Sequence, residues 1–300
     1  MKRELRNVGA SVRARLLERA RAEKSDFQLL LTRYVLERLL YRLSVSEYRD
    51  RFILKGALLL SVLAGDRFRP TRDLDLLGYG DTRLEALTDI FRTICAQPVT
   101  DDGVLFDIAR LEAALIREDT EYGGVRICTT ATVARARIPV QVDIGCGDAI
   151  TPGPVEIEYP ALLEFSAPHL RAYPVETIVA EKLEALVVLG MANSRLKDYY
   201  DLFLISQTFT LEQRSLAEAV RRTFERRGTA LLEQPPVGLT NEFASSWQAR
   251  WRGFLKREHM MPVPDDLAAV VRKLYDFLLP IIRGGDHDLR WLPGGPWSLR

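Results

Sequence analysis

Apolar residues near the N-terminus recur at the spacing of amphipathic helices. One run starts at Ser11, with Val12 and Leu16 on the same side, and a second run follows Ser25 and Asp26. Ser and Asp favour helix N-caps because their side chains accept hydrogen bonds from backbone N–H groups of the first turn. The pattern therefore predicts two amphipathic helices with basic outer faces.

The pattern then changes to a mixture of buried helix and strand. A buried helix is expected to start at Gly56, and DLDLLGYG, from Asp73, is typical of a short strand that ends at glycines. Residues 84–97 again have helical spacing. Three strands are expected in VLFDIARLEAALI, VRICTTATV and IPVQVDIG, with continuation into a helix left open for the first. The Pro-containing segment after residue 154 is expected at a sheet edge, because proline lacks the N–H that a strand ladder needs.

From Pro174 onward the apolar spacing is helical throughout. Helices are expected in VETIVAEKLEALVVLG, KDYYDLFLISQ, LEQRSLAEAVRRTFERRG, EFASSWQARWRGFLKR and DLAAVVRKLYDFLLPII. The change of pattern near residues 165–175 predicts a domain boundary, and the Pro-rich EQPPVGLTN predicts a second flexible joint. We therefore expect an α+β protein with a small mixed β-sheet and flanking helices over 1–170, followed by an all-α domain over 171–300.

Charge is distributed unevenly along a chain that is almost neutral as a whole. A chain of 300 residues is long enough for about two domains, 47% of its residues are hydrophobic, and its formal net charge is +1. Residues 1–55 nevertheless hold 14 Lys or Arg against 7 Asp or Glu. The net charge therefore does not exclude a polyanionic partner at the N-terminal helices, although a solvated helical face explains the same pattern.

Several other classes of site and protein are disfavoured. The three cysteines have no C-x-x-C spacing, which predicts reduced thiols rather than a disulfide framework or a thiolate metal site. The three histidines show no ligand spacing, so neither a zinc site nor a histidine base is indicated. No apolar stretch is long enough to cross a bilayer. We expect a cytoplasmic protein without a membrane partner.

Asp73 and Asp75 are the first candidates for chemistry. Residues two apart on a strand share a face, so both carboxylates lie together with Leu74 and Leu76 on the other side. Two nearby carboxylates repel each other unless a cation lies between them, and Mg²⁺ commonly takes one or two carboxylates together with substrate phosphates. A solvated strand end explains an isolated D-x-D equally well.

Two further features strengthen the metal interpretation. A helix starting at Gly56 would present free backbone amides to a phosphate. Asp143, in IPVQVDIG, offers a third carboxylate from another strand. Two-metal phosphoryl transfer uses such a set, with one ion on the triphosphate and another at the attacking hydroxyl. The pattern therefore predicts a nucleotide site with metal ligands Asp73, Asp75 and Asp143.

Four blocks of the sequence together resemble the AbiEii/AbiGii nucleotidyltransferase toxins, including MenT-like toxins, of the DNA polymerase β-like superfamily. The blocks are FILKGALLLSVLAGDRFRPTRDLDLLG, VQVDIGCGD, YPVETIVAEKLEALVVLG and NSRLKDYYDL, within roughly residues 10–210. The resemblance implies a nucleotidyltransferase fold for the N-terminal domain and a C-terminal domain that completes the active-site cleft. It implies the metal pair at Asp73 and Asp75 and the phosphate-binding helix at Gly56. Ala57 departs from the family, which usually has Ser or Gly there, so phosphate contact would rest on backbone amides and nearby cations.

The resemblance also implies functional residues in the C-terminal half. Lys182 would approach the triphosphate, and Asp198, favoured over Asp201, would position Lys182 or the acceptor hydroxyl. From the residues alone, Lys182 is also consistent with an exposed i, i+4 pair, and either acid with stabilisation of a helix N-terminus. The full set of expected nucleotide-binding residues is Lys55, Gly56, Arg72, Lys182, Arg195 and Asp201, and the expected catalytic residues are Asp73, Asp75, Asp143, Lys182 and Asp198.

The function implied is that of a toxin from a type IV-like toxin–antitoxin system. It would transfer NMP from an NTP to RNA, at the tRNA 3′ end, and so block translation. Mg²⁺, as two ions, or Mn²⁺ would be the cofactor, an AbiEi-like antitoxin the partner, and a monomer is favoured. Three alternatives remain: transfer to a protein side chain, a non-catalytic RNA- or partner-binding module, and a glycosyltransferase that uses D-x-D. The last leaves the upstream helix and the later Lys and Asp blocks unexplained.

Other basic or aromatic segments are candidate RNA surfaces. Tyr199 and Tyr200 are candidates for contact with a base, although a core residue beside a partly exposed one is the simpler expectation for this pair. The remaining segments are the loop with Arg67, Arg69 and Arg72, the N-terminal arginines Arg13, Arg15, Arg19, Arg21, Arg33 and Arg38, and the run from Trp247 to Lys256. Each is equally compatible with a solvated basic face.

Overall fold

Two compact units make up the protein. The computed structural model describes residues 7–65, 71–116, 123–231, 234–257, 263–284 and 288–299. The first unit comprises Met1–Leu58, Pro70–Gly147 and Glu156–Ala172, and the second Leu59–Arg69, Asp148–Val155 and Tyr173–Arg300. The chain passes between the units more than once, and the expected domain boundary after residue 170 stays a prediction.

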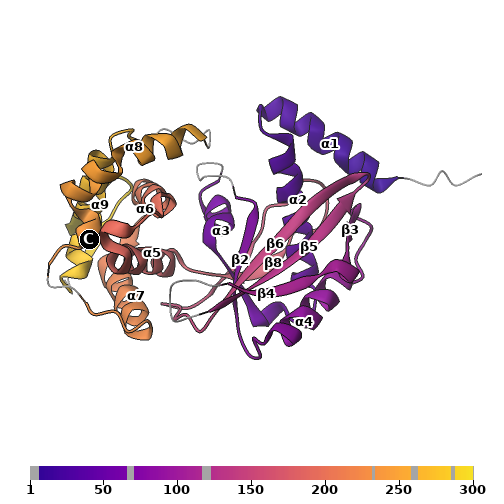
Figure 1. Ribbon diagram of the computed structural model, residues 1–300, viewed down its shortest axis with the longest axis horizontal. Coiled ribbons are helices and arrows are strands. Elements are labelled where there is room, and N and C mark those ends of the chain that lie inside the picture. Colours follow the sequence, from indigo (N-terminus) through magenta and orange to yellow (C-terminus); the bar gives the residue numbers. More distant parts are fainter. Residues whose placement is uncertain are drawn as a thin grey trace, which may run out of the picture. The chain divides into compact units, whose positions relative to one another are not determined.

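A mixed eight-stranded sheet forms the centre of the first unit (Figure 1). Its strand order is β3-β5-β6-β2-β1-β8-β7, and β4 also pairs with β5. Pairing is parallel between β2 and β6 and between β1 and β8, and antiparallel for β1 with β2 and for β5 with β3, β4 and β6. The strands are β1 (Phe52–Lys55), β2 (Asp73–Gly78), β3 (Val104–Phe106), β4 (Glu112–Ile116), β5 (Gly124–Val133), β6 (Ala136–Cys146), β7 (Val155–Glu158) and β8 (His169–Ala172). The prediction of a mixed sheet with flanking helices is confirmed.

Three helices pack on this sheet: α1 (Val8–Glu23), α2 (Phe27–Ser44) and α4 (Leu84–Ala96). α1 contacts α2 and β5, α2 contacts β6 and β8, and α4 contacts β4 and β5. α1 begins earlier than expected, because Asn7 rather than Ser11 caps it and accepts a hydrogen bond from the Ala10 N–H at 3.0 Å. The expected Asp26 cap of α2 is confirmed, with the Leu29 N–H donating at 2.7 Å.

Two strand predictions need correction. β1 was not expected, because FILK is a short apolar run without alternation and reads as part of the buried helix that follows. That helix, α3 (Gly56–Leu63), does begin at Gly56. The segment VLFDIARLEAALI forms β3 and β4 rather than one strand. A short 3-10 turn at Ile108–Arg110 separates the two strands. Asp107 caps this turn, because its side chain accepts a hydrogen bond from the Arg110 N–H.

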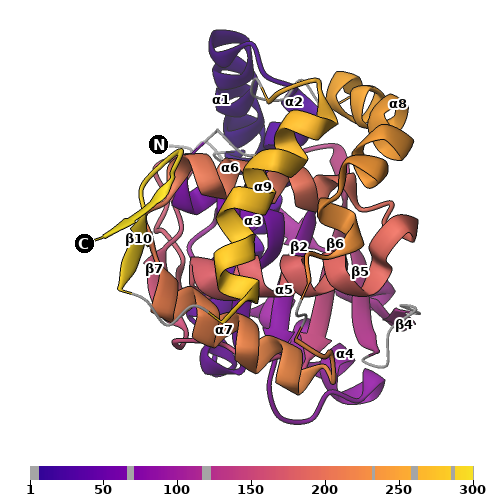
Figure 2. The ribbon, with the colours of Figure 1, turned by 90° about the vertical axis from the view of Figure 1, so that its left-hand side faces the viewer.

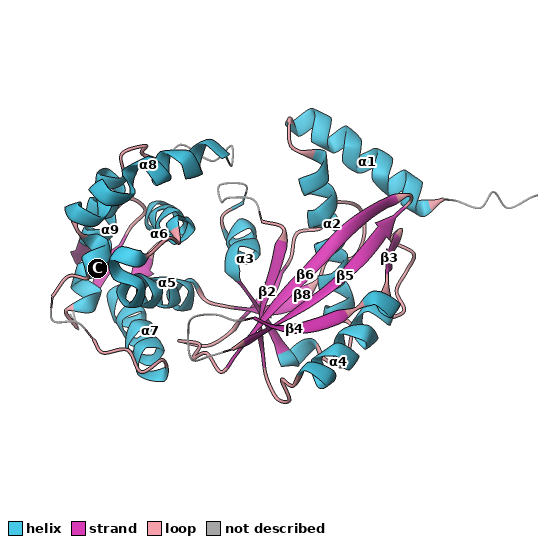
Figure 3. Ribbon diagram, in the orientation of Figure 1, coloured by secondary structure: helices cyan, strands magenta, loops and turns pink. Residues whose placement is uncertain are grey.

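The second unit is largely helical, but it is not all-α as expected (Figures 2 and 3). Its helices are α5 (Val175–Leu189), α6 (Leu196–Thr208), α7 (Gln213–Arg226), α8 (Asn241–Arg257) and α9 (Leu267–Ile282). A small antiparallel sheet accompanies them, formed by β9 (Leu211–Glu212), β10 (Leu289–Trp291) and β11 (Trp297–Leu299). The rings of Trp291 and Trp297 pack on Phe277 of α9, which anchors β10 and β11 to the helices. Strands of two or three residues are too short to show a period of two in the sequence.

Two expectations about the chain as a whole can be compared with the structure. None of the helices in the described ranges is both long and apolar enough to traverse a bilayer. Cys95, Cys128 and Cys146 form no disulfide. The cysteine thiols therefore contribute no covalent crosslink to either unit.

Candidate active site

Four charged residues lie side by side across the sheet of the first unit. Lys55 on β1 is opposite Asp75 on β2, Asp75 is opposite Asp143 on β6, and Asp143 is opposite Arg126 on β5. Residues directly opposite one another on paired strands project from the same face. We call these four residues the charged row. A cation lies at each end of the row, and the two carboxylates lie next to each other between them.

The charged row lies on the polar face of a sheet whose other face is apolar. All four side chains of the row are partly exposed, whereas the residues before and after them on β2, β5 and β6 are buried. Asp73 lies on the same face as Asp75, and the neighbouring Leu74 and Leu76 are each 1% exposed. The alternation therefore places both expected metal ligands on one side of β2, with Asp143 beside them.

Arg126 is the residue of this site that the sequence analysis missed. Its Nε and Nη2 donate to Oδ1 and Oδ2 of Asp143 at 2.8 and 2.7 Å, so both carboxylate oxygens are engaged. The hydrogen bond with Asp143 raises the pKa of Arg126 above its ordinary value. A signal existed in the sequence: β5 and β6 form a hairpin, and Arg126 is a charged residue at a polar position of the alternating strand that pairs with Asp143.

Gly56 has a structural role that is specific to Asp75. Its φ of +75° lies in the left-handed region that glycine adopts readily, at the turn from β1 into α3. A Cβ atom at this position would collide with the Asp75 carboxylate. The glycine therefore lets the backbone at the start of α3 approach the candidate metal ligand closely. Ala57, next in the chain, is 5% exposed. Binding of a phosphate at this helix start stays a prediction.

The carboxylates fit a hard divalent cation in part. Asp73 and Asp75 supply oxygen donors on one face, and Mg²⁺ is commonly bound by one or two carboxylates plus substrate phosphates. Within the described ranges, however, no three His, Cys, Asp or Glu side chains are arranged to hold one ion. Both oxygens of Asp143 are bound to Arg126 instead. The pair Asp73 and Asp75 thus suits the expected ion, whereas Asp143 as it stands is occupied.

The loop before β2 is only partly described. Arg72 is exposed, and the Thr71 Oγ1 lies 3.3 Å from the backbone N of Asp73. Arg67 and Arg69, the other expected cations of this loop, lie outside the described residues. Arg72 is therefore the cation of this loop that the structure places directly before the metal pair.

Lys182 forms the centre of a second charged group, in the second unit. Its Nζ donates to Oδ1 of Asp198 at 2.6 Å and to Oδ2 of Asp201 at 2.9 Å, so α5 and α6 are joined by two ion pairs. The Lys182 side chain is 14% exposed, which excludes the alternative of a solvated lysine. Burial alone would raise the pKa of Asp198, but the Lys182 ammonium outweighs it and the pKa is lowered. The i, i+3 spacing of the two acids places both on the face toward Lys182.

The start of α6 differs in detail from the expectation. The helix begins at Leu196, so Asp201 lies in the second turn, where the helix dipole does not explain it. Arg195 occupies the N-cap position with an exposed side chain, and the Asn193 Oδ1 accepts a hydrogen bond from its backbone N–H at 2.9 Å. Tyr199 and Tyr200 are both fully buried, so neither presents a ring to a nucleic-acid base.

A third charged group lies on α5 beside Lys182 and was not expected. Arg227, after α7, pairs with Glu184 and Asp148 at 2.9 Å each and with Glu181 at 3.5 Å. Tyr173 donates a hydrogen bond to Glu181 at 3.1 Å. Burial alone would lower the pKa of Arg227, but the carboxylates raise it. Residues from four separate segments meet here, which no local spacing in the sequence indicates.

Several expected RNA-binding residues serve the fold instead. Arg38 is 1% exposed and donates to the Ser166 carbonyl at 2.7 Å, and Arg19 donates to the Leu162 carbonyl at the same distance. Both arginines tie the segment that follows β7 to the N-terminal helices. In the aromatic and basic run of α8, Trp251 is fully buried and Trp247 is 8% exposed. Those indoles belong to the core and offer no stacking surface.

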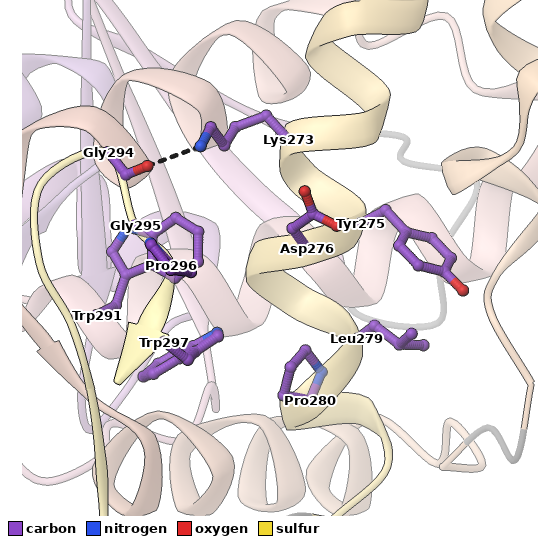
Figure 4. A pocket seen from close by; sticks show the side chains of 10 residues that line it. All are labelled: Lys273, Tyr275, Asp276, Leu279, Pro280, Trp291, Gly294, Gly295, Pro296 and Trp297. Atoms are coloured by element: carbon purple, nitrogen blue, oxygen red, sulfur yellow. Dashed lines mark hydrogen bonds between the residues drawn. The ribbon is translucent and has the colours of Figure 1, made fainter. Parts of the chain in front are cut away.

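A pocket of about 430 Å³ lies elsewhere in the second unit, between α9 and the strands β10 and β11 (Figure 4). Trp291, Trp297 and Pro280 line it together with Asp276 and Lys273. The Lys273 ammonium donates to the Gly294 carbonyl at 2.7 Å, which fixes one wall. None of the expected catalytic or nucleotide-binding residues lines this pocket, so it is distinct from the candidate site.

Comparisons with known proteins identify the family and the fold of the chain. The sequence profile of a family described as "Nucleotidyl transferase AbiEii toxin, Type IV TA system" matches residues 38–273, a range that contains every expected site residue. No curated protein matches the chain. A provisionally assigned nucleotidyltransferase from H. pylori is 13% identical with a TM-score of 0.52, and the match covers 87% of this chain and 99% of that one. JHP933 from Helicobacter pylori is also 13% identical, with a TM-score of 0.51 and coverages of 86% and 93%. The structural likeness shows a shared fold, and the profile match shows that the chain belongs to the AbiEii family of nucleotidyltransferase toxins of type IV toxin–antitoxin systems.

Proposed function

We propose that this nucleotidyltransferase transfers NMP from an NTP to the 3′ end of tRNA and thereby blocks translation. The 3′ hydroxyl would attack the α-phosphorus, the bond between the α-phosphorus and the bridging oxygen would break, and pyrophosphate would leave with that oxygen. The observation that carries the proposal is the placement of Asp73 and Asp75 on one face of β2, beside the in-register Asp143. Asp75 adjoins the turn at Gly56 where α3 begins, and a helix N-terminus offers backbone amides to an anion.

The first unit would supply the metal ligands and part of the triphosphate site. In the proposal Asp73 and Asp75 bind Mg²⁺ or Mn²⁺, as two ions when Asp143 also contributes. When bound, these ions neutralise phosphate charge and lower the pKa of the attacking hydroxyl. Lys55 lies opposite Asp75 and immediately before Gly56, which suits a cation that binds phosphate at the start of α3. Arg72, exposed before β2, is assigned the same role.

The second unit would supply Lys182 and the residues that position it. The carboxylates of Asp198 and Asp201 restrict where the Lys182 Nζ lies, because it donates a hydrogen bond to each of them at 2.6 and 2.9 Å. In the proposal Lys182 binds the triphosphate together with Arg195, which is exposed at the start of α6. Asp198 and Asp201 are positioning residues in this scheme. We further propose that the toxin acts as a cytoplasmic monomer and that an AbiEi-like antitoxin neutralises it.

Labelling separates this function from its alternatives. Purified protein is incubated with each labelled NTP, Mg²⁺, and either total RNA or a cell protein extract. Wild type should label RNA, and Asp75→Ala should lose at least about a hundredfold in rate because a metal ligand is removed. Asp81→Ala is the matched control, since Asp81 follows the same strand and pairs with Arg83 rather than with the charged row. The control should label RNA at the wild-type rate.

The acceptor end is tested with the same reaction. In this test the RNA is oxidised with periodate before it meets the enzyme, which destroys its terminal cis-diol. If the tRNA 3′ end is the acceptor, the oxidised RNA should take up no label. Label in the oxidised RNA would overturn the 3′-end assignment. Label found only in the protein extract would replace RNA by a protein side chain as acceptor. If wild type and Asp75→Ala both failed to transfer label, a role confined to binding RNA or a partner would be favoured.

A further inference from the structure

The charged row is nearly neutral by itself, before any metal ion or nucleotide is considered. Arg126 and Lys55 stand at its two ends, and the carboxylates of Asp143 and Asp75 occupy the middle. Neighbouring strands are about 4.8 Å apart, so the two carboxylates start from adjacent backbone positions. Such a pair repels unless cations lie close to it. In the protein as it stands, Arg126 is the cation bound to Asp143.

Arg126 and a divalent ion would compete for the same atoms. The guanidinium uses Nε and Nη2 to contact both oxygens of Asp143, at 2.8 and 2.7 Å. An ion bound to Asp143 would need at least one of those oxygens and would lie close to the guanidinium charge. Arginine cannot relieve this repulsion by losing its proton, because a guanidinium stays protonated in proteins. Arg126 therefore opposes ion binding at Asp143 for as long as it stays bound to both oxygens.

The position of Arg126 allows it to move away from Asp143. Its side chain is 40% exposed, whereas that of Asp143 is 21% exposed. The long arginine side chain can thus turn toward solvent without unpacking the apolar face of the sheet. A phosphate group is a preferred bidentate partner of a guanidinium, and a nucleoside triphosphate brings phosphates to this site in the proposed reaction. The anion that would draw Arg126 away is therefore the substrate itself.

We propose that Arg126 is an internal counter-cation that blocks divalent-ion binding at Asp143 in the nucleotide-free protein. The nucleotide-free protein then binds one ion strongly, at Asp73 and Asp75, and the site at Asp143 opens only when Arg126 is withdrawn. Binding of a second ion, at Asp143, therefore depends on the presence of the triphosphate. This inference rests on the proposed function, because it takes Asp73 and Asp75 as metal ligands.

Binding of Mn²⁺ alone, without nucleotide, tests the inference. Free Mn²⁺ is measured by electron paramagnetic resonance across a titration of the full chain. Wild type should show one strong site. Arg126→Met removes the charge at similar length and should add a second site whose Kd is at least about tenfold lower than any second site of wild type, as expected for loss of a competing charged hydrogen bond. Arg126→Lys, which keeps a cation but loses the bidentate geometry, should lie between the two.

Arg137→Met is the matched control for this titration. Arg137 lies on β6 with an exposed side chain, six positions from Asp143 and therefore about 20 Å along the strand. Its substitution should leave Mn²⁺ binding unchanged. In the double variant Arg126→Met with Asp143→Asn, the additional Mn²⁺ site should disappear, because the Asp143 carboxylate that would bind the ion is removed. Circular dichroism melting curves verify that each variant is folded.

The outcomes distinguish this inference from the proposed function. If Arg126→Met bound Mn²⁺ no more tightly than wild type, or less tightly, Arg126 would orient Asp143 rather than compete for it, and the inference would be wrong. The metal assignment of the proposed function would still stand if Asp73→Asn or Asp75→Asn weakened the strong site. If neither of these substitutions altered Mn²⁺ binding, the metal assignment would fail and the inference would fail with it.

Discussion

Gly56 has a positive φ and also lies against Asp75, a candidate metal ligand. Gly56→Ala should destabilise the protein because the backbone adopts a φ of +75° and because the new methyl group collides with Asp75. The left-handed conformation alone costs an L-residue about 1–2 kcal/mol, and the collision should add at least about 1 kcal/mol. Urea unfolding measures the loss of stability, and the same variant should bind Mn²⁺ more weakly.

Gly228→Ala is the control that separates the two effects. Gly228 has a φ of +64°, but nothing lies within 4 Å of a Cβ placed there. Its substitution should cost only the backbone contribution and leave Mn²⁺ binding intact. Equal losses of stability in the two variants, with Mn²⁺ binding unchanged in both, would contradict the role assigned to the close approach of Gly56 and Asp75.

Single residues also show how far sequence reasoning reached at the candidate site. The period of two along β2 was sufficient to put Asp73 and Asp75 on one face, because strand geometry is local. The contact between Lys182 and the pair Asp198 and Asp201 was expected only from a family resemblance, since it joins two helices. Arg126 was missed because its importance comes from the register of a hairpin, which hydrophobic spacing alone does not define.

At the scale of elements, a hydrogen bond to a buried carboxylate joins α2 to the segment after β7. Glu37 of α2 is 0% exposed, and its Oε2 accepts from the Leu162 N–H at 2.7 Å. Burial raises the pKa of Glu37 from 4.5 to about 7, although the nearby Arg38 acts in the opposite direction. The folded protein therefore retains a proton on Glu37 in a pH range in which the unfolded chain has already lost it.

This difference predicts a pH dependence of stability. A raised carboxyl pKa favours the folded state at low pH, so the wild type should lose stability as the pH rises from about 4.5 to about 7, by up to about 3 kcal/mol. Glu37→Gln cannot ionise and should remove that loss, with a flatter profile above pH 5. Urea midpoints at half-unit pH intervals measure it, with Glu164→Gln, an exposed residue of the same segment, as control. A profile unchanged by Glu37→Gln would disprove the assignment.

Elements were predictable in proportion to their length and amphipathicity. The long helices α7 and α9 combine many apolar positions at one period, and both were expected. The strands β1 and β8 have four residues each, and β9 has two, so their formation is decided by partners distant in the chain. Sheet order likewise depends on non-local pairing, and the parallel pair of β2 and β6 brings Asp75 next to Asp143 across more than sixty residues.

At the scale of the whole molecule, the expected site residues are divided between the two units. Asp73, Asp75 and Asp143 belong to the first unit, and Lys182 and Asp198 to the second. The overall net charge of +1 gave no indication of this division. The family, and with it the nucleotidyltransferase class, was predictable from four sequence blocks in a fixed order.

The division predicts that metal binding and transfer can be lost separately. Lys182→Arg keeps a cation between Asp198 and Asp201 but replaces a compact ammonium by a planar guanidinium, so triphosphate binding should suffer more than stability. We expect transfer of label to fall at least about tenfold while Mn²⁺ binding stays at the wild-type value. Lys197→Arg, an exposed neighbour, should change neither quantity. Full transfer by Lys182→Arg would argue against a role of Lys182 at the triphosphate.

The positions of the tryptophans provide a spectroscopic consequence. All four of them, Trp247, Trp251, Trp291 and Trp297, lie in the second unit. Fluorescence excited at wavelengths that only indole absorbs therefore reports on the second unit alone. The first unit, which holds the sheet with the charged row, contributes no tryptophan signal. Far-ultraviolet circular dichroism follows both units. A denaturation curve recorded by both methods would reveal directly whether the halves of this enzyme melt as one cooperative body or in succession.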